Sequence, residues 1–233
     1  MTRLFRLLCC LACLMLLPGL FQGAQAAQQV DPFERLFGRQ SFPASTKDFP
    51  VYIAQHWTRV LKEEQDNPCL QRTRSCLPAA DAPHWLYLVN KAPTMDEMTL
   101  LRTVTAFFNK FPSASDLENY GVEDRWPTLA DFFSRRSGDC KAYTLSKYFA
   151  LRALGLKDNV LRIVLVHIPK RRANHALLAV STAKGVFILD NNTRPIDLIL
   201  PQEKFSSQFI PLFMFNETGR WTFRPDPELL RAK

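Results

Sequence analysis

The chain has 233 residues, of which 47% are hydrophobic and 22% are charged, with a formal net charge of +8. It shows no internal repeat and no low-complexity segment, and its length suits one domain with a sizeable core. In an exported chain, this moderate charge favours acidic protein surfaces or anionic polymers and is no indication of nucleic-acid binding. The basic run Lys170-Arg171-Arg172 is predicted to be a solvated loop, with substrate steering as the alternative.

Residues 1–26 are predicted to be a cleaved secretory signal peptide. Two arginines precede an apolar run from Leu7 to Leu17, and Ala24-Gln25-Ala26 offers small residues for cleavage. The run is too short for a membrane span, and the short apolar region before Cys13 disfavours a lipoprotein signal. Cleavage after Ala26 would shorten the chain from 233 to 207 residues and lower the basic residues from 30 to 28, against 22 acidic ones.

The exported part is predicted to divide into an arm and one domain. Residues 27–46 are polar and contain proline without sustained periodicity, so they are predicted to form a flexible N-terminal arm. Residues 47–233 are predicted to form a single domain.

Helices are predicted in the first half of this domain. Apolar residues recur at helical spacing over residues 47–64 and 95–111. Residues 112–126 are predicted to be a loop, after which Pro127 and Thr128 form a typical helix start.

Three cysteines remain once the signal peptide is removed. Cys69 and Cys76 flank a short polar segment, and in an oxidising compartment their pairing would stabilise the fold by about 2–3 kcal/mol in the chain-entropy model. A zinc site from these cysteines and His84 lacks a fourth ligand at suitable spacing. Pairing leaves Cys140 as the odd thiol, which calls for a functional explanation, with an inert buried cysteine as the alternative.

Cys140 begins a predicted amphipathic helix over residues 140–154. Asp139 is a good N-cap and Gly138 suits a tight turn, while Gly155 ends the helix in the usual position. The apolar stripe along this helix predicts that it packs on the core. The first turn has backbone N–H groups without intrahelical partners, and these favour the nucleophilic thiolate form of a cysteine.

The rest of the chain is predicted to form strands. Residues 160–168, 176–180, 185–189 and 209–215 are apolar on both faces, which is typical of central strands, and residues 220–223 are a candidate final strand. Helices followed by an antiparallel sheet predict an α+β fold.

A hairpin joins the strand that His175 begins to the strand that Asp190 ends. If residues 181–184 form its turn, Val180 pairs with Gly185 and His175 lies opposite Asp190, with Cα atoms about 4.5–5.5 Å apart. A turn tip two residues later would move Asp190 along the strand and weaken this pair.

Cys140, His175 and Asp190 are therefore predicted to form a catalytic triad. An imidazole relays protons efficiently when a third group fixes its tautomer, and Asp190 is placed to do so. His167 competes as the base, but no acid lies at hairpin spacing from it. Trp126 is the candidate second donor of an oxyanion hole through its indole N–H, with a plain core position as its alternative role.

Several stretches in this order and spacing resemble the bacterial transglutaminase-like cysteine peptidases, the LapG-type periplasmic proteases. They cover roughly residues 85–222 and are Val89-Asn90, Phe107-Phe108-Asn109, Tyr120-Gly121-Val122-Glu123-Asp124-Arg125-Trp126-Pro127-Thr128, Gly138-Asp139-Cys140, Lys147-Tyr148-Phe149-Ala150-Leu151-Arg152, Asn174-His175, Leu189-Asp190-Asn191 and Phe215-Asn216. The resemblance implies a papain-like, transglutaminase-like fold with Cys140 as nucleophile, His175 as general base and acid, and Asp190 as orienter. It also implies a periplasmic location.

In the adhesin-cleaving branch of this family, the substrate is the N-terminal part of a large surface adhesin, and an inner-membrane receptor for a cyclic dinucleotide controls access to it. That branch carries acidic residues directly after the cysteine, and they help bind calcium. Here Lys141 and Ala142 follow Cys140, and Asp139 alone is retained. A cation cannot ligate a hard, oxygen-coordinated ion, so no cofactor is predicted, and the departure puts calcium dependence and the adhesin substrate in doubt. Lys141 would instead help hold Cys140 as thiolate.

The sequence thus predicts an exported cysteine endopeptidase that acts through a thioester acyl-enzyme on a periplasmic or cell-surface protein. A transglutaminase or amidase would use the same triad and pass the acyl group to an amine, and a product assay with and without a primary amine separates the two. A non-catalytic binding module is the third reading, although such a protein would be expected to have lost at least one member of the triad. The scissile bond, the regulatory partner and the oligomeric state are not predicted.

Overall fold

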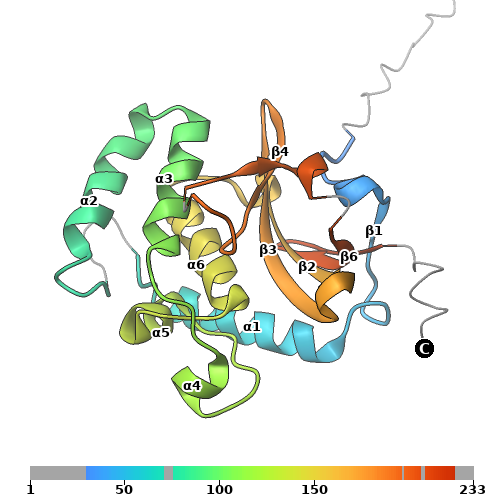
Figure 1. The fold of residues 1–233 in the computed structure, drawn as a ribbon, viewed down its shortest axis with the longest axis horizontal. Coiled ribbons are helices and arrows are strands. Elements are labelled where there is room, and N and C mark those ends of the chain that lie inside the picture. Colours follow the sequence, from blue (N-terminus) through green and yellow to red (C-terminus); the bar gives the residue numbers. More distant parts are fainter. Residues whose placement is uncertain (1–29, 71–75, 196, 206–207, 224–233) are drawn as a thin grey trace, which may run out of the picture. The chain divides into compact units, whose positions relative to one another are not determined.

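Helices lie mostly in the first half of the described chain and strands in the second (Figure 1). The computed structural model describes residues 30–70, 76–195, 197–205 and 208–223, and the predicted signal peptide lies outside them. Asp31–Lys233 forms one compact unit. Within the described residues, none of the helices combines the length and the apolar character needed to span a bilayer.

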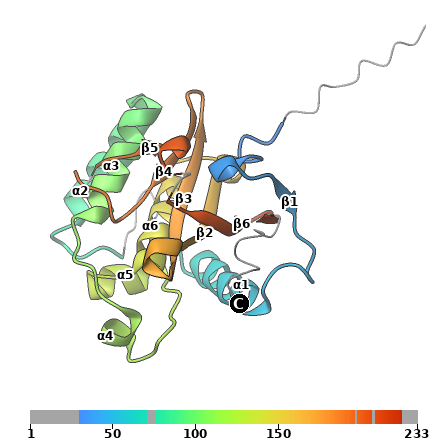
Figure 2. The same cartoon turned by 45° about the vertical axis from the view of Figure 1, so that its right-hand side comes forward.

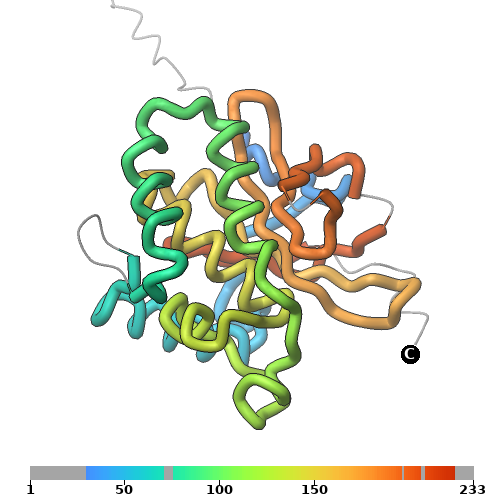
Figure 3. Tube along the Cα trace, turned by 60° about the vertical axis from the view of Figure 1, so that its left-hand side comes forward, coloured from blue at the N-terminus to red at the C-terminus, as the bar shows by residue number. Residues whose placement is uncertain are grey.

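The helical part matches the predicted pattern in four places and adds two helices. The α-helices of the described residues are α1 (Val51–Asp66), α2 (Ala82–Lys91), α3 (Glu97–Asn109), α4 (Asp116–Tyr120), α5 (Leu129–Arg135) and α6 (Cys140–Ala153). The sequence does not predict α2, and it assigns the α4 segment to a loop. Helix α4 is short, and a capping box of Ser115 and Glu118 defines its start rather than an apolar stripe. Its segment loops away from the other helices before the chain returns to α5 (Figure 3).

The strands form one sheet with the order β1-β7-β6-β2-β3-β4-β5. They are β1 (Ser41–Pro43), β2 (Leu161–Ile168), β3 (Ala173–Thr182), β4 (Gly185–Leu189), β5 (Leu200–Pro201), β6 (Ile210–Phe215) and β7 (Arg220–Phe223). All of the pairings between these strands are antiparallel. The predicted α+β class is confirmed, and the most apolar runs, β2 and β3, are central strands as predicted.

Both faces of this sheet are covered by other parts of the chain. Helix α6 packs directly against β2 and β3, with α3 and α5 against its other sides (Figure 2). On the opposite face, Phe33, Leu36 and Phe209 pack against strand residues such as Val164 and Leu177. Strands that are apolar on both sides need two covering layers, because either uncovered face would leave apolar surface in water.

The prediction of a flexible arm is wrong for residues 31–43. Phe33 and Leu36 are fully buried, the 3-10 helix η1 spans Leu36–Gly38, and β1 pairs with β7 at the edge of the sheet. A few apolar residues in a polar segment gave no periodicity, yet they cover the second face of the sheet. Residues 27–29 of the predicted arm lie outside the described residues.

The β3–β4 hairpin has a shorter turn than the sequence analysis assumes. Thr182 pairs with Gly185, which leaves a turn of two residues, and Gly185 has a φ of +115°, a conformation that favours glycine. The predicted direct pairing of His175 with Asp190 is therefore wrong by two residues. A shift of two residues keeps both on the same face of the sheet, whereas a shift of one would have separated them.

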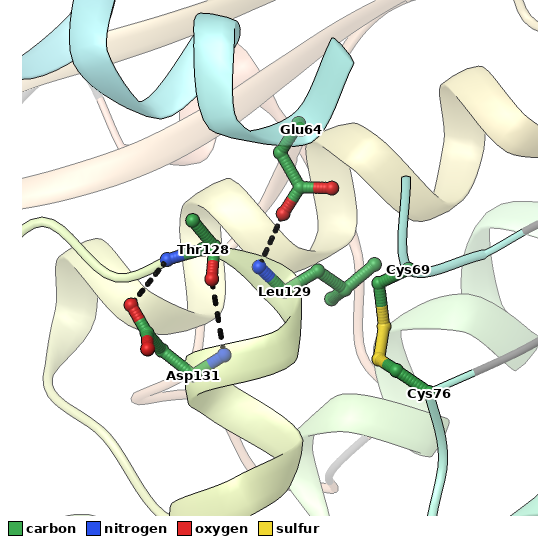
Figure 4. Close-up of a disulfide and its surroundings, with 6 residues drawn as sticks. All are labelled: Glu64, Cys69, Cys76, Thr128, Leu129 and Asp131. Carbon is green, nitrogen blue, oxygen red and sulfur yellow. Dashed lines mark hydrogen bonds between the residues drawn. A yellow bond between two sulfur atoms is a disulfide. The ribbon is translucent and has the colours of Figure 1, made fainter. Parts of the chain in front are cut away.

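The predicted disulfide between Cys69 and Cys76 is present, beside the junction of α1 and α5 (Figure 4). Glu64, near the end of α1, accepts a hydrogen bond of 2.5 Å from the backbone N–H of Leu129. At the same helix start, Thr128 and Asp131 form a capping box. These contacts fix the place at which helix α5 begins.

Candidate active site

Cys140 is the first residue of α6, as the sequence predicts. Its neighbour Asp139 is the N-cap and accepts a hydrogen bond of 3.0 Å from the backbone N–H of Ala142. Cys140 is partly exposed, and among the described cysteines it is the one outside the disulfide. The thiol therefore lies at the positive end of a helix that runs into the core.

Gly138 leaves room for the first turn of α6 to form directly beside it. A Cβ atom at this position would lie 2.4 Å from the Ala142 Cβ and 3.4 Å from the ring of Phe132. The sequence analysis attributes Gly138 to a tight turn, but this glycine is not among those with positive φ. The absence of a side chain, rather than an unusual backbone conformation, is what the position requires.

His175 and Asp190 form a buried hydrogen-bonded pair. The His175 Nε2 lies 2.8 Å from the Asp190 Oδ1, and both side chains are 5% exposed. The imidazole also stacks on the ring of Phe209, with centroids 6.2 Å apart and planes at 19°. His175 and Cys140 line the same cleft, and Cys140 contributes to raising the pKa of His175. Since Nε2 faces Asp190, Nδ1 is the nitrogen left for the thiol, so the structure brings the three predicted residues together.

The backbone around Asp190 is fixed by groups that the sequence analysis did not assign to the site. The Asp190 carbonyl accepts hydrogen bonds from Asn109 Nδ2 at 2.9 Å and from Thr193 Oγ1 at 3.3 Å. The Asp190 carboxylate accepts another from the backbone N–H of Asn192 at 3.2 Å. Asn109 is a buried polar residue at the end of α3. The signal in the sequence that could have indicated its role is a polar residue directly after the apolar residues of a helix.

The electrostatics of this pair favour a protonated imidazole. Burial by itself would lower the pKa of His175, but the hydrogen bonds to Asp190 and Cys140 outweigh it and raise the pKa to about 9. Burial would raise the pKa of Asp190, and the hydrogen bond and charge of His175 reverse this, so that the pKa is lowered. His175 is therefore an imidazolium at neutral pH, placed between a carboxylate and a thiol.

An open cleft of about 210 Å³ exposes this site. Cys140, His175 and Trp126 contribute to its walls, together with apolar side chains that include Leu165 and Phe213. Trp126 is 3% exposed. It stacks between His56 and Phe215, with centroid distances of 5.7 and 5.8 Å. Its place in the cleft wall is compatible with the predicted donor role and equally with a packing role.

His167, the competing candidate for the base, contacts a different kind of side chain. Its Nδ1 is 3.1 Å from the Asn174 Oδ1, so its hydrogen-bond partner is an amide and not an acid. The arrangement of Cys140, His175 and Asp190 is the one that suits nucleophilic chemistry by a thiol.

A family model of the bacterial transglutaminase-like cysteine proteinases matches residues 67–223, which is more than half of the chain. The chain belongs to this family. The match includes the three residues described above and the segment of the disulfide.

Solved structures of LapG from Legionella pneumophila resemble this transglutaminase-like proteinase. The calcium-bound form is 24% identical with a TM-score of 0.53, and the alignment covers 71% of this chain and 86% of that one. A second LapG structure and an EGTA-treated form are 23% and 22% identical, each with a TM-score of 0.54 and each covering 74% of this chain and 91% of the other. At these identities the likeness shows the fold. Among curated protein sequences, none matches the chain.

Lys141, the residue after the cysteine of this family member, lies among three carboxylates. Its Nζ is 3.0 Å from the Asp116 Oδ2 and 3.3 Å from the Asp124 Oδ1, and it also contacts the Asp139 Oδ2. Burial would lower the pKa of Lys141, but the charges of Asp139 and Asp116 raise it, so the side chain is an ammonium. Its charge is matched by these carboxylates, which leaves the prediction that it holds the Cys140 thiolate without support.

Lys147 is a second lysine of α6 and lies two turns after the cysteine. The side chain is fully buried, and its Nζ is among the buried polar atoms without a hydrogen-bond partner. Burial lowers the pKa of Lys147 to about 7, although the charge of Asp190 opposes this. The sequence analysis includes Lys147 in a matching stretch but gives it no role.

Proposed function

We propose that the protein is a cysteine endopeptidase in which Cys140 is the nucleophile, His175 the general base and acid, and Asp190 the group that orients His175. The observation that carries this proposal is that His175, hydrogen-bonded to Asp190, lines an open cleft together with Cys140. Membership of a cysteine proteinase family supports the same reading. The triad is complete, which speaks against a binding module that has lost its chemistry.

The reaction follows from this arrangement in two steps. The Cys140 thiolate attacks the carbonyl carbon of the scissile peptide bond, and the carbonyl oxygen becomes an oxyanion. The His175 imidazolium gives its proton to the leaving amine as the C–N bond breaks, which leaves a thioester on Cys140. Water then attacks the thioester and His175 accepts its proton, so that the carboxylate product leaves and the thiolate is restored. The Cys140 backbone N–H and Trp126 are the proposed donors to the oxyanion.

The proposed substrate is a protein in the periplasm or at the cell surface, such as a large adhesin. The predicted signal peptide supports export, and the resemblance to LapG-type proteases supports a periplasmic location and control by an inner-membrane receptor. An open cleft suits an extended polypeptide better than an enclosed pocket would. We propose no metal cofactor.

The first test is the reactivity of Cys140. In the purified chain without its signal peptide, iodoacetamide should label Cys140 alone, and the rate should already be at its plateau at neutral pH. His175→Ala should slow the labelling, since it removes the imidazolium that stabilises the thiolate. Labelling that appears only at alkaline pH would mean that the pair is not assembled in the isolated protein, and a binding role would then be favoured.

The second test identifies the reaction. Cell-surface proteins are incubated with the protein or with Cys140→Ser, and new termini are identified by mass spectrometry with and without an added primary amine. New N-termini that depend on Cys140 establish a peptidase. Amine incorporation without chain cleavage would establish acyl transfer instead.

A further inference from the structure

The three carboxylates around Lys141 come from separate segments of the chain. Asp116 is the first residue of α4, Asp124 belongs to the loop that leads to Trp126, and Asp139 is the N-cap of α6. The Lys141 side chain is 20% exposed and that of Asp116 is 2% exposed. An ion cluster that is buried at Asp116 and exposed at Asp124, whose side chain is 47% exposed, thus joins the α4 segment, one wall of the cleft and the start of the helix that carries Cys140.

The cluster includes backbone as well as side chains. The Asp116 Oδ2, which contacts the ammonium, also accepts a hydrogen bond of 2.8 Å from the backbone N–H of Arg125. Arg125 directly precedes Trp126, and Lys141 directly follows Cys140. Two residues of the cleft wall are therefore tied to one ion cluster through their neighbours.

Three converging carboxylates repel one another and need a cation between them. Asp116 is buried, and burial together with the charge of Asp139 raises its pKa. An isolated carboxylate in this position would be strongly unfavourable. Without a positive charge in their midst, the three segments would be expected to move apart, and the start of α6 would move with Asp139.

The residues present do not fit a calcium ion at this place. Calcium needs six to eight oxygen ligands at about 2.3–2.6 Å, but the point on which the three carboxylates converge is taken by the Lys141 Nζ. Within the described residues, no group of three or more His, Cys, Asp or Glu side chains is arranged to hold a metal ion. A divalent ion would have to displace a tethered ammonium from its own counter-ions.

We propose that Lys141 is a positioning residue that acts as a built-in cation, holding Asp116, Asp124 and Asp139 together in the way that a bound metal ion would. The chain then keeps the geometry of Cys140 and Trp126 without a divalent ion. Removal of the ammonium should turn the same three carboxylates into a site that responds to calcium. This inference concerns the fold around the cleft and does not depend on peptidase activity.

The test compares the wild type and two variants in EGTA and in excess calcium, by thermal unfolding and by the rate of Cys140 alkylation. The wild type should give the same Tm and the same rate in both conditions. Lys141→Gln should lower the Tm in EGTA and slow the alkylation by about tenfold, the lower end of the range for loss of a supporting shell, and calcium should restore both. Lys141→Arg, which keeps the charge, should remain insensitive to calcium.

Lys62→Gln is the matched control, because Lys62 pairs with Asp66 at an exposed position of α1. It should behave as the wild type in both conditions. A wild-type Tm that rises with calcium would overturn the proposal, since a metal would then bind despite Lys141. A Lys141→Gln variant that equals the wild type in EGTA and ignores calcium would overturn it as well.

If Lys141→Gln does not fold, a measurement on the wild type tests whether the ion cluster around Lys141 forms. Lysine acylation is followed residue by residue with mass spectrometry on the folded protein. Lys141 should react far more slowly than Lys62, because its ammonium is held among three carboxylates. Equal rates for the two lysines would show that the cluster does not form.

Discussion

The titration of His175 depends on two neighbours, and one of them can be removed without disturbing the packing. Asp190 contributes a hydrogen bond and a negative charge, and together with Cys140 it raises the pKa of His175 to about 9. We predict that Asp190→Asn, which keeps the shape and loses the charge, lowers this pKa. NMR titration of the imidazole measures it directly, and an unchanged midpoint would show that Asp190 does not act on His175 electrostatically.

The same shift fixes how His175 affects stability. A group whose pKa rises from 6.5 in the unfolded chain to about 9 in the fold stabilises the fold most below the lower value. That contribution is lost as the pH rises through the higher value. The difference in Tm between the wild type and His175→Ala should therefore become smaller as the pH rises from 6.5 to about 9.

For Lys147, the stability contribution changes with pH in the opposite direction. Its pKa falls from 10.5 to about 7 in the fold, so the unfolded chain binds the extra proton, and the stability rises with pH across this window. We predict that Lys147→Met, which keeps the volume and removes the buried amine, stabilises the fold by about 1–3 kcal/mol at neutral pH. The gain should shrink as the pH approaches 10.5. Urea unfolding at several pH values measures it, and a loss of stability at all of them would mean that Lys147 is favourably paired.

At this scale the sequence predicts the three side chains that the structure brings together and misses the buried polar side chains around them. Cys140, His175 and Asp190 were identified by their chemistry and by their positions at element ends. Asn109 and Lys147 act through burial, and a sequence does not show which polar residue of an apolar helix has its side chain inside. Lys141 was recognised as a cation, but its partners at residues 116 and 124 depend on how the α4 segment folds.

Among the elements, the junction of α5 and α6 determines where the nucleophile lies. The two helices are joined by a short connection, and the side chains of Phe132 and Ala142 meet at Gly138. The hydrogen bond from the Ala114 N–H to the Gly138 carbonyl, 3.0 Å long, fixes the same peptide from the other side. The start of α6 therefore has little room to move.

Gly138→Ala tests this packing. The new methyl group would lie 2.4 Å from the Ala142 Cβ in the first turn of α6, so the backbone before α6 must shift relative to that turn. We predict a loss of stability of about 1–3 kcal/mol, which is typical of overpacking. The alkylation rate of Cys140 should fall with it, because the first turn of α6 moves. Gly155→Ala is the control for the loss of a glycine at a helix end, since a Cβ there has no atom within 4 Å but is strained by its φ of +100°. It should lower the stability without slowing the alkylation.

The hairpin shows what sequence reasoning can and cannot determine about an element. The apolar runs predicted β3 and β4 themselves, but not the length of the turn between them. Several turn lengths satisfy the same alternation, and each changes the register by an even or odd number of residues. The observed shift is even, so His175 and Asp190 still share a face, and the predicted contact survives an incorrect pairing.

In the domain as a whole, the sheet is the central layer, and the segments on both of its faces pack against it. Helix α6 covers one face and carries Cys140 at its N-terminus, while η1, Phe205 and Phe209 cover the other face. The two-sided apolar pattern of the strands already implied a second cover. The sequence did not indicate which segment provides it, because Phe33 and Leu36 stand among polar residues.

This dependence leads to a prediction about where the domain begins. A chain that starts at residue 47, the predicted domain boundary, lacks Phe33, Leu36 and β1, so Val164 and Leu177 would face water. Deleting a fully buried phenylalanine side chain alone costs about 3–5 kcal/mol, which is a large part of the 5–15 kcal/mol that typically stabilises a domain. We expect this shorter chain to lack a cooperative thermal transition, whereas a chain that starts at residue 30 should keep one. Phe33→Ala in the longer chain should keep a cooperative transition but at a lower Tm than the longer chain without the substitution. A cooperative transition at the same Tm in both chains would show that residues 30–46 are dispensable, as their composition suggested, and that the second face of the sheet is stable without them.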